Sequence, residues 1–344
     1  MPFMSGYWPT IPVILPMDRP HVPSRVVVTG ATGFIGSVLC AALVDHGYQV
    51  TAQCRRRPER DEVVSGGARW VPLEVRTASA MDWRSLLEDA DVVIHLAARA
   101  HEGTSGQSRS HLRAINVEAA VSLAQQAYEA GIRRFVYLSS IGVLGRSGLA
   151  PLTETRAPAP ADPYAWSKYE AERALWEAIP GTAMSLTVIR PPLVYGPNAP
   201  GNFGRLLAWT RHCRPLPLGG VTDNERSFVG LHNLVDFILR VLTHPQAENQ
   251  VFHVADEETV STAALLQMLA RAAGRDPKLL RIPPGMLRAG ARLVGRTGSL
   301  DRLLGSLTVD TRKAREMLGW RPPLSLEAGL HDAVARHVHS EAIP

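Results

Sequence analysis

The sequence predicts an α/β fold in which a doubly wound parallel sheet is joined to a smaller α+β lobe. Short apolar runs alternate with helical segments from residue 25 to about residue 190, and such alternation is typical of a parallel sheet covered by helices. A β-branched run leads directly into the triplet Gly30, Gly33 and Gly36. After residue 190 the alternation stops, and residues 191–225 are rich in glycine and proline.

The expected strands of the main sheet are short, apolar and rich in residues that favour extended structure. They cover residues 25–29, 48–53, 68–71, 91–96, 134–138 and 185–189. The helices expected between them cover residues 35–46, 81–87 and 116–130. Gly47 and Gly131 directly follow two of these helices, as glycine commonly does where a helix ends.

The second half of the chain is less regular. Helices are expected at 232–243 and 261–273, with a strand at 251–254. We assign these elements to a smaller lobe that is inserted into, and follows, the main sheet. The expected organisation is therefore a Pro-rich arm at 1–24, a main domain at 25–190, and a region at 191–344 that is mainly the small lobe, with some segments returning to the main sheet.

Composition and charge narrow the class of partner. A chain of 344 residues with 45% hydrophobic residues can bury a large core. The formal net charge of +5 and the pI near 9.4 suit an anionic partner. The basic residues are scattered, apart from Arg55, Arg56 and Arg57. We therefore expect a small anionic ligand rather than nucleic acid.

Cysteine and hydropathy patterns set further limits. Cys40, Cys54 and Cys213 are widely spaced and odd in number, and the twelve histidines show no clustered ligand pattern. We expect neither a disulfide framework nor a metal site, and we place the protein in a reducing cytoplasm. No apolar run approaches the length of a membrane span, so stable membrane insertion is not expected.

The glycine triplet predicts a dinucleotide-binding turn between the first strand and the first helix. Gly30 allows a tight turn, Gly33 lets the backbone approach a pyrophosphate, and Gly36 lets the helix pack closely on the sheet. The helix N-terminus then faces the phosphates. Because the triplet follows a strand and opens a helix, it indicates a Rossmann-type NAD(P)-binding domain.

The residues after the second strand bear on which dinucleotide binds. An acidic residue there would hydrogen-bond the adenosine ribose of NAD, but Cys54 occupies that place, followed by Arg55 and Arg56. No carboxylate repels a 2′-phosphate, and guanidinium groups are available to bind one. The sequence therefore favours NADP(H) over NAD(H), with a solvated arginine loop as the alternative.

Tyr164 and Lys168 form a candidate acid/base pair. Residues four apart share one face of a helix, and Asp162 as N-cap with Pro163 at the first helical position predicts that this helix begins here. A nearby cation favours the phenolate, so we expect Lys168 to lower the pKa of Tyr164 toward working pH. Such a phenol can exchange a proton with a carbonyl or alcohol oxygen.

Together these motifs resemble the extended short-chain dehydrogenase/reductase family, of the NAD-dependent epimerase/dehydratase type, over about residues 25–330. The resemblance rests on TGATGFIG at 29–36, HLAA at 95–98, Asn116, Ser139-Ser140, Tyr164 with Lys168, RPPLVYGP at 190–197, RSFVGLHNLVD at 226–236 and LGWRP at 318–322. Members of this family mostly act on nucleotide sugars.

The resemblance implies roles for particular residues. The implied cofactor-binding positions are Gly30, Gly33, Phe34, Ile35 and Gly36 at the pyrophosphate, Glu74 and Val75 at the adenine, Ala97 and Ala98 flanking the dinucleotide, Asn116, and Lys168 at the nicotinamide ribose. Ser140 would bond the reacting oxygen, and Tyr164 would be the acid/base. The implied substrate positions, for the uridine and diphosphate, are Asn202, Phe203, Leu218 and Arg226.

Departures from the family pattern narrow the reaction. The family's 4,6-dehydratases carry an Asp-Glu pair after the catalytic Ser/Thr, whereas this chain has Ile141 and Gly142, which cannot do acid/base work. Dehydration is therefore not expected. Leu193 replaces an Asn common in the family, and Leu144 replaces a usual aromatic residue, so the pattern does not define the sugar.

Three functions remain open. Several motifs are similar to those of bacterial surface-polysaccharide enzymes, which implies NADPH-dependent reduction of the C4 keto group of a UDP-linked 4-keto-6-deoxy sugar. Similar proteins are UDP-glucose 4-epimerases, so an NAD-dependent UDP-hexose 4-epimerase is the alternative. A non-catalytic NADP-binding regulator is the third possibility, although the Tyr164–Lys168 pair argues against it. The family also implies a homodimer, formed through a helix pair that includes the Tyr164 helix.

Overall fold

The structure is a computed structural model of the chain. It describes residues 24–56, 67–75, 81–99, 109–145, 150–179, 183–293 and 303–340. The predicted Pro-rich arm lies outside the described residues except for Ser24, and Arg57 lies outside them too.

Seven parallel strands form the main sheet of the described chain, in the order β3-β2-β1-β4-β5-β6-β9. They are β1 (Arg25–Thr29), β2 (Gln49–Cys54), β3 (Arg69–Pro72), β4 (Val92–His95), β5 (Arg134–Leu138), β6 (Ser185–Arg190) and β9 (Gln250–His253). The strand order reverses between β1 and β4, which defines the topological switch point of a doubly wound sheet. The predicted fold class is confirmed.

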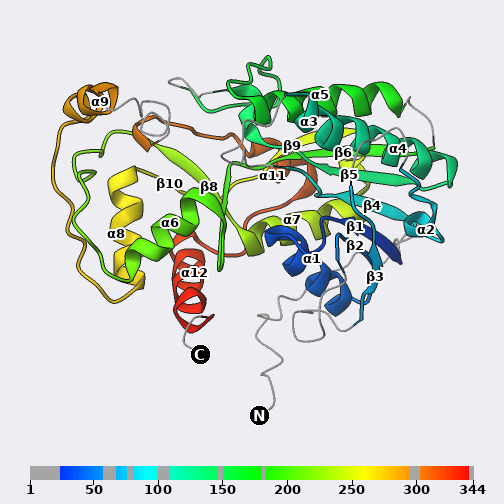
Figure 1. Ribbon diagram of the computed structural model, residues 1–344, viewed down its shortest axis with the longest axis horizontal. Helices are drawn as coiled ribbons and strands as arrows, with labels where there is room; N and C mark the ends of the chain where they lie inside the picture. The colour runs from blue at the N-terminus through cyan, green and yellow to red at the C-terminus, as the bar shows by residue number, and fades with distance from the viewer. Residues whose placement is uncertain are drawn as a thin grey trace, which may run out of the picture.

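Helices cover both faces of this sheet (Figure 1). One face carries α1 (Phe34–Asp45) and α7 (Leu231–Thr243), and the other carries α2 (Arg84–Leu87), α3 (Arg109–Arg113), α4 (Ala119–Glu129) and α5 (Pro163–Ala178). Side chains alternate across each strand. Val26 and Val28 therefore join the apolar core under α1 and α7, whereas Val27 joins the core under α4 and α5.

The structure places α7 and β9 with the main sheet, although the sequence analysis grouped their segments with the small lobe. β9 pairs with β6 in parallel, and α7 packs against α1. Arg134 fixes the end of α7, because its Nη1 donates to the carbonyls of Val241 and Leu242 at 2.7 Å each. An apolar run shows that a strand is buried but does not show which sheet receives it.

The small lobe lies beside the carboxyl ends of the main strands (Figure 1). Its sheet has the order β10-β8-β7, with β7 (Leu193–Tyr195), β8 (Arg226–Gly230) and β10 (Thr259–Val260). Its helices are α6 (Gly201–Thr210), α8 (Thr262–Ala272), α9 (Pro284–Leu293) and α12 (Leu326–Ser340), while α11 (Arg312–Leu318) contacts β9. None of the helices in the described ranges is long and apolar enough to cross a membrane.

Candidate active site

The candidate active site lies where the carboxyl ends of the main strands meet the small lobe. Three predicted segments follow strands there: the glycine turn after β1, Ala97 and Ala98 after β4, and Ser140 after β5. Ligands of open α/β sheets bind outside the carboxyl ends of the strands, at the switch point. The topology thus brings most of the predicted cofactor and catalytic positions to one edge.

The glycine turn is shaped by close backbone contacts. Gly30 has a φ of +69°, and a Cβ there would lie 2.9 Å from the Ala97 nitrogen. A Cβ on Gly36 would lie 2.2 Å from the Gly30 carbonyl oxygen, well inside van der Waals contact. Both positions therefore require glycine, which confirms the predicted tight turn and close helix packing.

The buried Gln53, near the end of β2, also fixes this turn. Its Oε1 accepts a hydrogen bond from the Gly30 N–H at 2.8 Å, and its Nε2 donates to the Leu73 carbonyl. The side chain thus joins the glycine turn to the segment that carries Glu74 and Val75. The sequence shows only a glutamine near the end of the strand, directly before Cys54, and does not show its partners.

The turn fits the phosphates of a dinucleotide. α1 has twelve residues and no acidic residue in its first turn, and its N-cap, Gly33, provides no side-chain cap. The first N–H groups of such a helix are available to an anion, and the helix dipole favours negative charge there. Phe34 and Ile35 are half-buried, with side chains that pack on the core, so their backbone forms the edge of this cradle.

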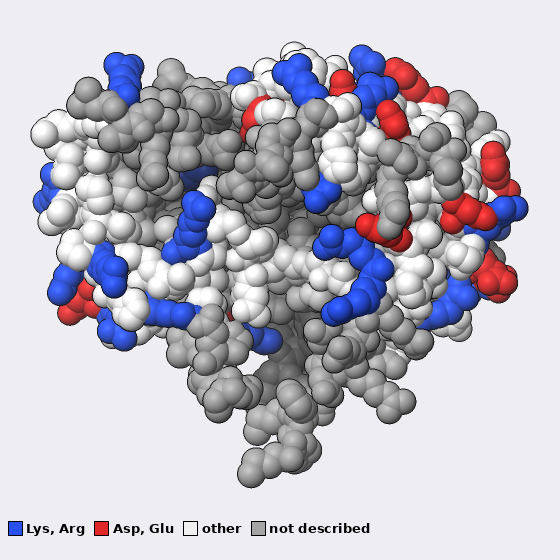
Figure 2. Space-filling view, in the orientation of Figure 1, with Lys and Arg blue, Asp and Glu red and all other residues white. Residues whose placement is uncertain are grey.

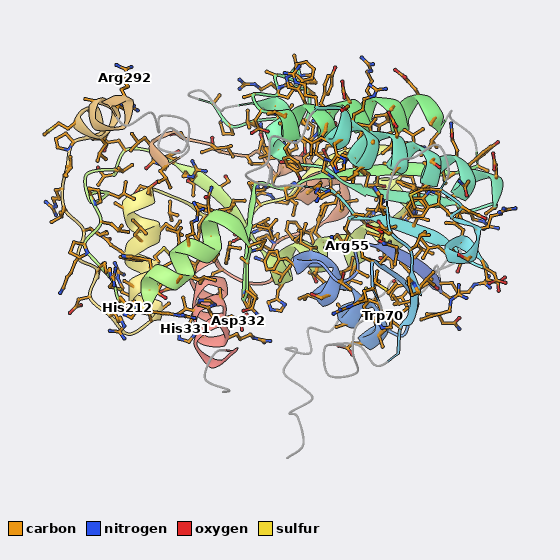
Figure 3. The ribbon with its side chains drawn as sticks, viewed as in Figure 1. Arg55, Trp70, His212, Arg292, His331 and Asp332 are labelled. Atoms are coloured by element: carbon orange, nitrogen blue, oxygen red, sulfur yellow. The ribbon has the colours of Figure 1, made fainter. Side chains whose placement is uncertain are left out.

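The end of β2 presents arginines and no carboxylate. Cys54 is the last residue of β2 and is buried, and Arg55 and Arg56 directly after it are exposed. Arg55 lies at the end of β2 near α1 (Figure 3). Elsewhere on the face shown in Figure 2, Lys and Arg are spread over both lobes without one dense patch, as the sequence indicated.

Asn116 ties the segment after β4 to α5. It lies in a π-helical turn, Ala114–Glu118, between α3 and α4, and such turns often occur at functional sites. Its side-chain amide pairs with the backbone of Arg99, accepting at 2.8 Å and donating at 3.2 Å, and donates to Ser167 Oγ at 2.9 Å. Asn116 therefore positions the segment that follows Ala97 and Ala98 relative to α5.

α5 begins as the sequence predicts. Asp162 is the N-cap and accepts a hydrogen bond from the Ala165 N–H at 2.9 Å, with Pro163 at the first helical position. Tyr164 is thereby fixed in the first turn of the helix. Ser140 caps a short 3₁₀ turn that packs on α5, where its Oγ accepts from the Gly142 N–H at 3.1 Å.

The prediction that Lys168 lowers the pKa of Tyr164 is wrong for the chain without ligands. Burial, with a smaller contribution from the Asp162 charge, raises the pKa of Tyr164 to about 12. The phenol is therefore protonated at neutral pH. Loss of solvent around the phenol disfavours its charged form, and this burial cannot be read from the spacing of Tyr164 and Lys168.

Lys168 is itself deeply buried. Its Nζ donates to the Leu138 carbonyl at 2.7 Å and lies 4.6 Å from the centre of the Tyr137 ring. Burial lowers the pKa of Lys168 to about 7, and the charge of Glu172 acts against that shift. The ammonium is thus held between β5 and α5, and its charge is sensitive to what surrounds it.

The predicted substrate residues differ in how exposed their side chains are. Asn202 is exposed at the start of α6, whereas Phe203 is fully buried against Tyr195, with ring centroids 5.5 Å apart. Leu218 is also buried, among apolar residues of the small lobe. The side chains of Phe203 and Leu218 are therefore core residues, and a ligand could meet only their backbone.

Arg226 keeps a position suited to an anion. It begins β8, its Nη1 donates to the Gly305 carbonyl at 3.0 Å, and its guanidinium lies 5.9 Å from the centre of the Phe228 ring. Burial lowers its pKa from the ordinary value, yet an arginine stays charged. A half-buried guanidinium of this kind can bind a diphosphate.

Sequence reasoning missed an ion pair beneath Lys168. Arg190, at the end of β6, bonds both carboxylate oxygens of Glu172, from Nε at 2.9 Å and from Nη2 at 2.5 Å, and both side chains are buried. Glu172 stands four residues after Lys168, a spacing that was visible in the sequence. Its partner on a strand could not be identified without the fold.

The arrangement combines a dinucleotide-binding turn with a protonated phenol and a buried ammonium. A phenol that starts protonated can donate its proton to a carbonyl oxygen as that oxygen gains charge. A nearby ammonium stabilises the phenolate that this transfer leaves behind. The site is therefore suited to proton transfer that accompanies hydride transfer to a carbonyl.

Comparison with known proteins agrees with this geometry. The model of the NAD dependent epimerase/dehydratase family matches residues 26–255. The UDP-glucose 4-epimerase of Vibrio cholerae is 36% identical over 318 residues, which cover 91% of this chain and 94% of that protein.

Two solved structures share the fold over nearly the whole chain. The UDP-glucose 4-epimerase of Thermotoga maritima with UDP-glucose has a TM-score of 0.74 at 25% identity and covers 92% of this chain and 99% of that one. MoeE5 in complex with UDP-glucuronic acid and NAD gives the same values. The chain therefore belongs to the NAD-dependent epimerase/dehydratase family, the extended short-chain dehydrogenases/reductases, and is an enzyme that uses a pyridine nucleotide.

Proposed function

We propose that this enzyme reduces the C4 keto group of a UDP-linked 4-keto-6-deoxy sugar with NADPH, in the synthesis of a surface-polysaccharide precursor. The main support for a reductase is the end of β2, where the buried Cys54 and the exposed Arg55 and Arg56 stand in place of a carboxylate. The protonated state of Tyr164 is a second support, since a reductase needs an acid at that oxygen.

The proposed roles are those that the family resemblance implies for these side chains. NADPH, when bound along the glycine turn, supplies hydride to C4. Tyr164 donates its proton to the C4 oxygen as negative charge develops there. Ser140 would hydrogen-bond the same oxygen, and Lys168 would stabilise the phenolate and hold the nicotinamide ribose. Groups arranged in advance around developing charge stabilise the transition state more than the ground state.

The rest of the ligands would be held by groups at the end of β2 and in the small lobe. Arg55 and Arg56 would bind the 2′-phosphate of the cofactor, with Glu74 and Val75 at the adenine. Arg226 and Asn202 would hold the UDP portion of the substrate, with backbone contacts from Phe203 and Leu218. Arginine suits both anions because its planar fork can bond two oxygens at once.

A UDP-hexose 4-epimerase is the second candidate, supported by the 36% identity to the Vibrio cholerae UDP-glucose 4-epimerase. Purified enzyme would be incubated with UDP-glucose, UDP-GlcNAc and a UDP-4-keto-6-deoxy sugar, with and without NADPH. Stoichiometric NADPH oxidation on the keto sugar is expected. Interconversion of UDP-hexoses without net oxidation would establish the epimerase instead, and binding without turnover would favour a regulator.

The cofactor preference has a separate test. The double variant R55A/R56A is expected to weaken NADPH binding by roughly ten- to a hundredfold, since charged hydrogen bonds are lost, with little change for NADH. R84A is the matched control, because Arg84 is an exposed arginine paired with Asp82. A wild-type enzyme that binds NADH more tightly than NADPH would contradict the proposal.

We also propose a homodimer formed through α4 and α5. Exposed aromatic side chains on these helices support it: Tyr128 on α4, and Trp166 and Trp176 on α5, are 36–44% exposed. Aromatic side chains are enriched at protein interfaces. The variant Y128R/W176R is expected to shift the mass measured by sedimentation from dimer to monomer. A wild-type monomer at micromolar concentration would overturn this assembly.

A further inference from the structure

The space between α5 and the main sheet holds a buried group of charged side chains. Lys168 and Glu172 enter it from α5, and Arg190 enters it from the end of β6, and each is at most 7% exposed. Charged groups are seldom buried in this way unless they are paired. Their burial beside the proposed acid/base pair calls for a functional explanation, because apolar side chains would fill the same space at lower cost.

Glu172 lies on the same buried face of α5 as Lys168. A residue four positions along a helix projects from the same face one turn later, so Glu172 follows Lys168 on the side of α5 that packs on the sheet. Arg190 bonds both oxygens of Glu172, at 2.9 Å and 2.5 Å. This bidentate contact fixes the carboxylate and leaves it little freedom to turn toward solvent.

The other groups around Lys168 are neutral. From β5 come the Leu138 carbonyl and the Tyr137 ring, and from β4 comes His95; Tyr164 stands one turn before Lys168 on α5. Burial raises the pKa of Tyr137 and lowers that of His95 to about 3, so neither carries charge at neutral pH. The negative charge that acts on the ammonium is therefore that of Glu172.

We propose that the Glu172–Arg190 pair is a positioning unit for the catalytic helix, which keeps the Lys168 ammonium charged in spite of its burial. This inference rests on the proposed function, in which Lys168 must carry a positive charge to stabilise the phenolate of Tyr164. Glu172 and Arg190 act through Lys168 and do not touch substrate. Their role differs from that of a structural ion pair, because it determines the pH range in which Lys168 is charged.

The chain offers a direct measurement of this effect. It contains only three lysines, Lys168, Lys278 and Lys313, so a protein labelled with ¹³C at lysine Cε gives three signals by NMR. The variant K168M identifies the signal of Lys168. Titrating that signal reports the pKa of Lys168 without substrate or turnover, while Lys278 serves as the reference in the same spectrum.

E172Q is expected to lower the pKa of Lys168 by roughly one unit or more, since an opposite charge within a few ångströms commonly shifts a pKa by that amount. In the reductase assay, the basic limb of the pH profile of kcat/KM moves to lower pH. Lowering the pH of the assay then restores part of the lost activity, because it protonates Lys168. E248Q is the control: Glu248 pairs with Arg134 at 2.6 Å at the start of β5, at the opposite end of that strand from Ser140. It should change neither the titration nor the profile.

E172Q leaves Arg190 buried without its partner, so the double variant E172Q/R190Q is measured as well. It removes both charges, and it too should lower the pKa of Lys168. An unchanged pKa in a folded E172Q or double variant would overturn the inference. Because the titration needs no substrate, a shifted pKa together with a failed reductase assay would overturn only the proposed reaction.

Discussion

The two faces of the main sheet differ in the kinds of side chain that they bury. Under α1 and α7 the interface is a largely apolar cluster that extends from Val26 to Trp320. Under α4 and α5 the middle of the interface is also apolar, but toward the carboxyl ends it contains buried polar groups. These are Thr29, His95, Asn116, Lys168, Glu172, Arg190 and His253.

One face of the sheet therefore mainly stabilises the fold, and the other carries the residues of the proposed chemistry. Burying apolar surface stabilises the folded state roughly in proportion to its area, whereas buried ionisable groups lose hydration and are stabilising only when well paired. The face under α1 and α7 therefore holds the sheet together. The face under α5 contributes less stability because it buries ionisable groups, and these include the phenol and the ammonium of the proposed reaction centre.

The largest expected effect comes from Lys168→Met on the polar face. Activity should fall by about a thousandfold or more, since the charge that assists acid/base catalysis is lost. Thermal stability should rise by a few degrees, roughly 2 °C per kcal/mol, because an ammonium that burial disfavours is replaced by an apolar chain of similar length. Turnover and calorimetry on the same sample check both parts. A fall in the melting temperature would show that Lys168 stabilises the fold.

Phe237→Ala makes the opposite test on the apolar face. Phe237 is fully buried, with its ring 4.9 Å from that of Trp320 and 5.9 Å from that of Phe252. Its loss should reduce the free energy of unfolding by about 3–5 kcal/mol, as measured by urea denaturation. The pH profile of the surviving activity should not move. A shifted profile would mean that the two faces are not independent.

Acid should destabilise the fold through the histidines that are buried on the polar face. Burial lowers the folded-state pKa of His95 and His253 to about 3, below the ordinary value of 6.5. The unfolded chain therefore binds more protons between these values. Stability is fully present above pH 6.5 and is lost as pH falls toward 3, at up to about 1.4 kcal/mol per pH unit for each histidine.

His253→Gln isolates one of these contributions. Glutamine can still donate to the Leu152 carbonyl, which lies 3.2 Å from His253 Nδ1, but it does not titrate. The free energy of unfolding, measured in urea, should be higher for the wild type at pH 6.5. This advantage over the variant should decrease steadily down to pH 4. Parallel curves would indicate that His253 is protonated in the folded state.

The smallest effect is expected at Thr29→Val. The Thr29 hydroxyl lies 2.8 Å from His95 Nδ1 in the buried layer, and its removal should cost about 1–3 kcal/mol, because a buried polar atom loses its partner. Thr29→Ser keeps the hydroxyl and should recover most of this loss. Equal destabilisation by both variants would mean that the Thr29 methyl group, which serine lacks and valine keeps, contributes as much as the hydroxyl.

The sequence allowed the elements of the sheet and the glycine turn to be predicted, because these depend on local patterns. Gly30 and Gly36 sit where only a missing side chain fits, and Asp162 caps α5 through a contact three residues away. Strand ends moved by a residue or two, as β2 and β3 show. Such boundaries depend on pairing across the sheet rather than on the strand alone.

The features that could not be predicted from the sequence depend on contacts between distant segments. The pKa of Tyr164 was misjudged because burial outweighs the neighbouring cation. Arg190 meets Glu172 only after β6 has paired with β5. Phe203 was assigned to substrate by resemblance, yet its side chain fills the core of the small lobe.

The position of β9 has a consequence for synthesis of the chain. β6 remains an open edge until residues 250–253 pair with it, and an unpaired edge can bind other chains. At typical bacterial and eukaryotic translation rates, synthesis from the end of β6 at residue 190 to residue 253 takes on the order of three to thirteen seconds. During that interval the nascent chain carries an incomplete sheet, so chaperones that shield strand edges should matter more for this protein than for one whose sheet closes early.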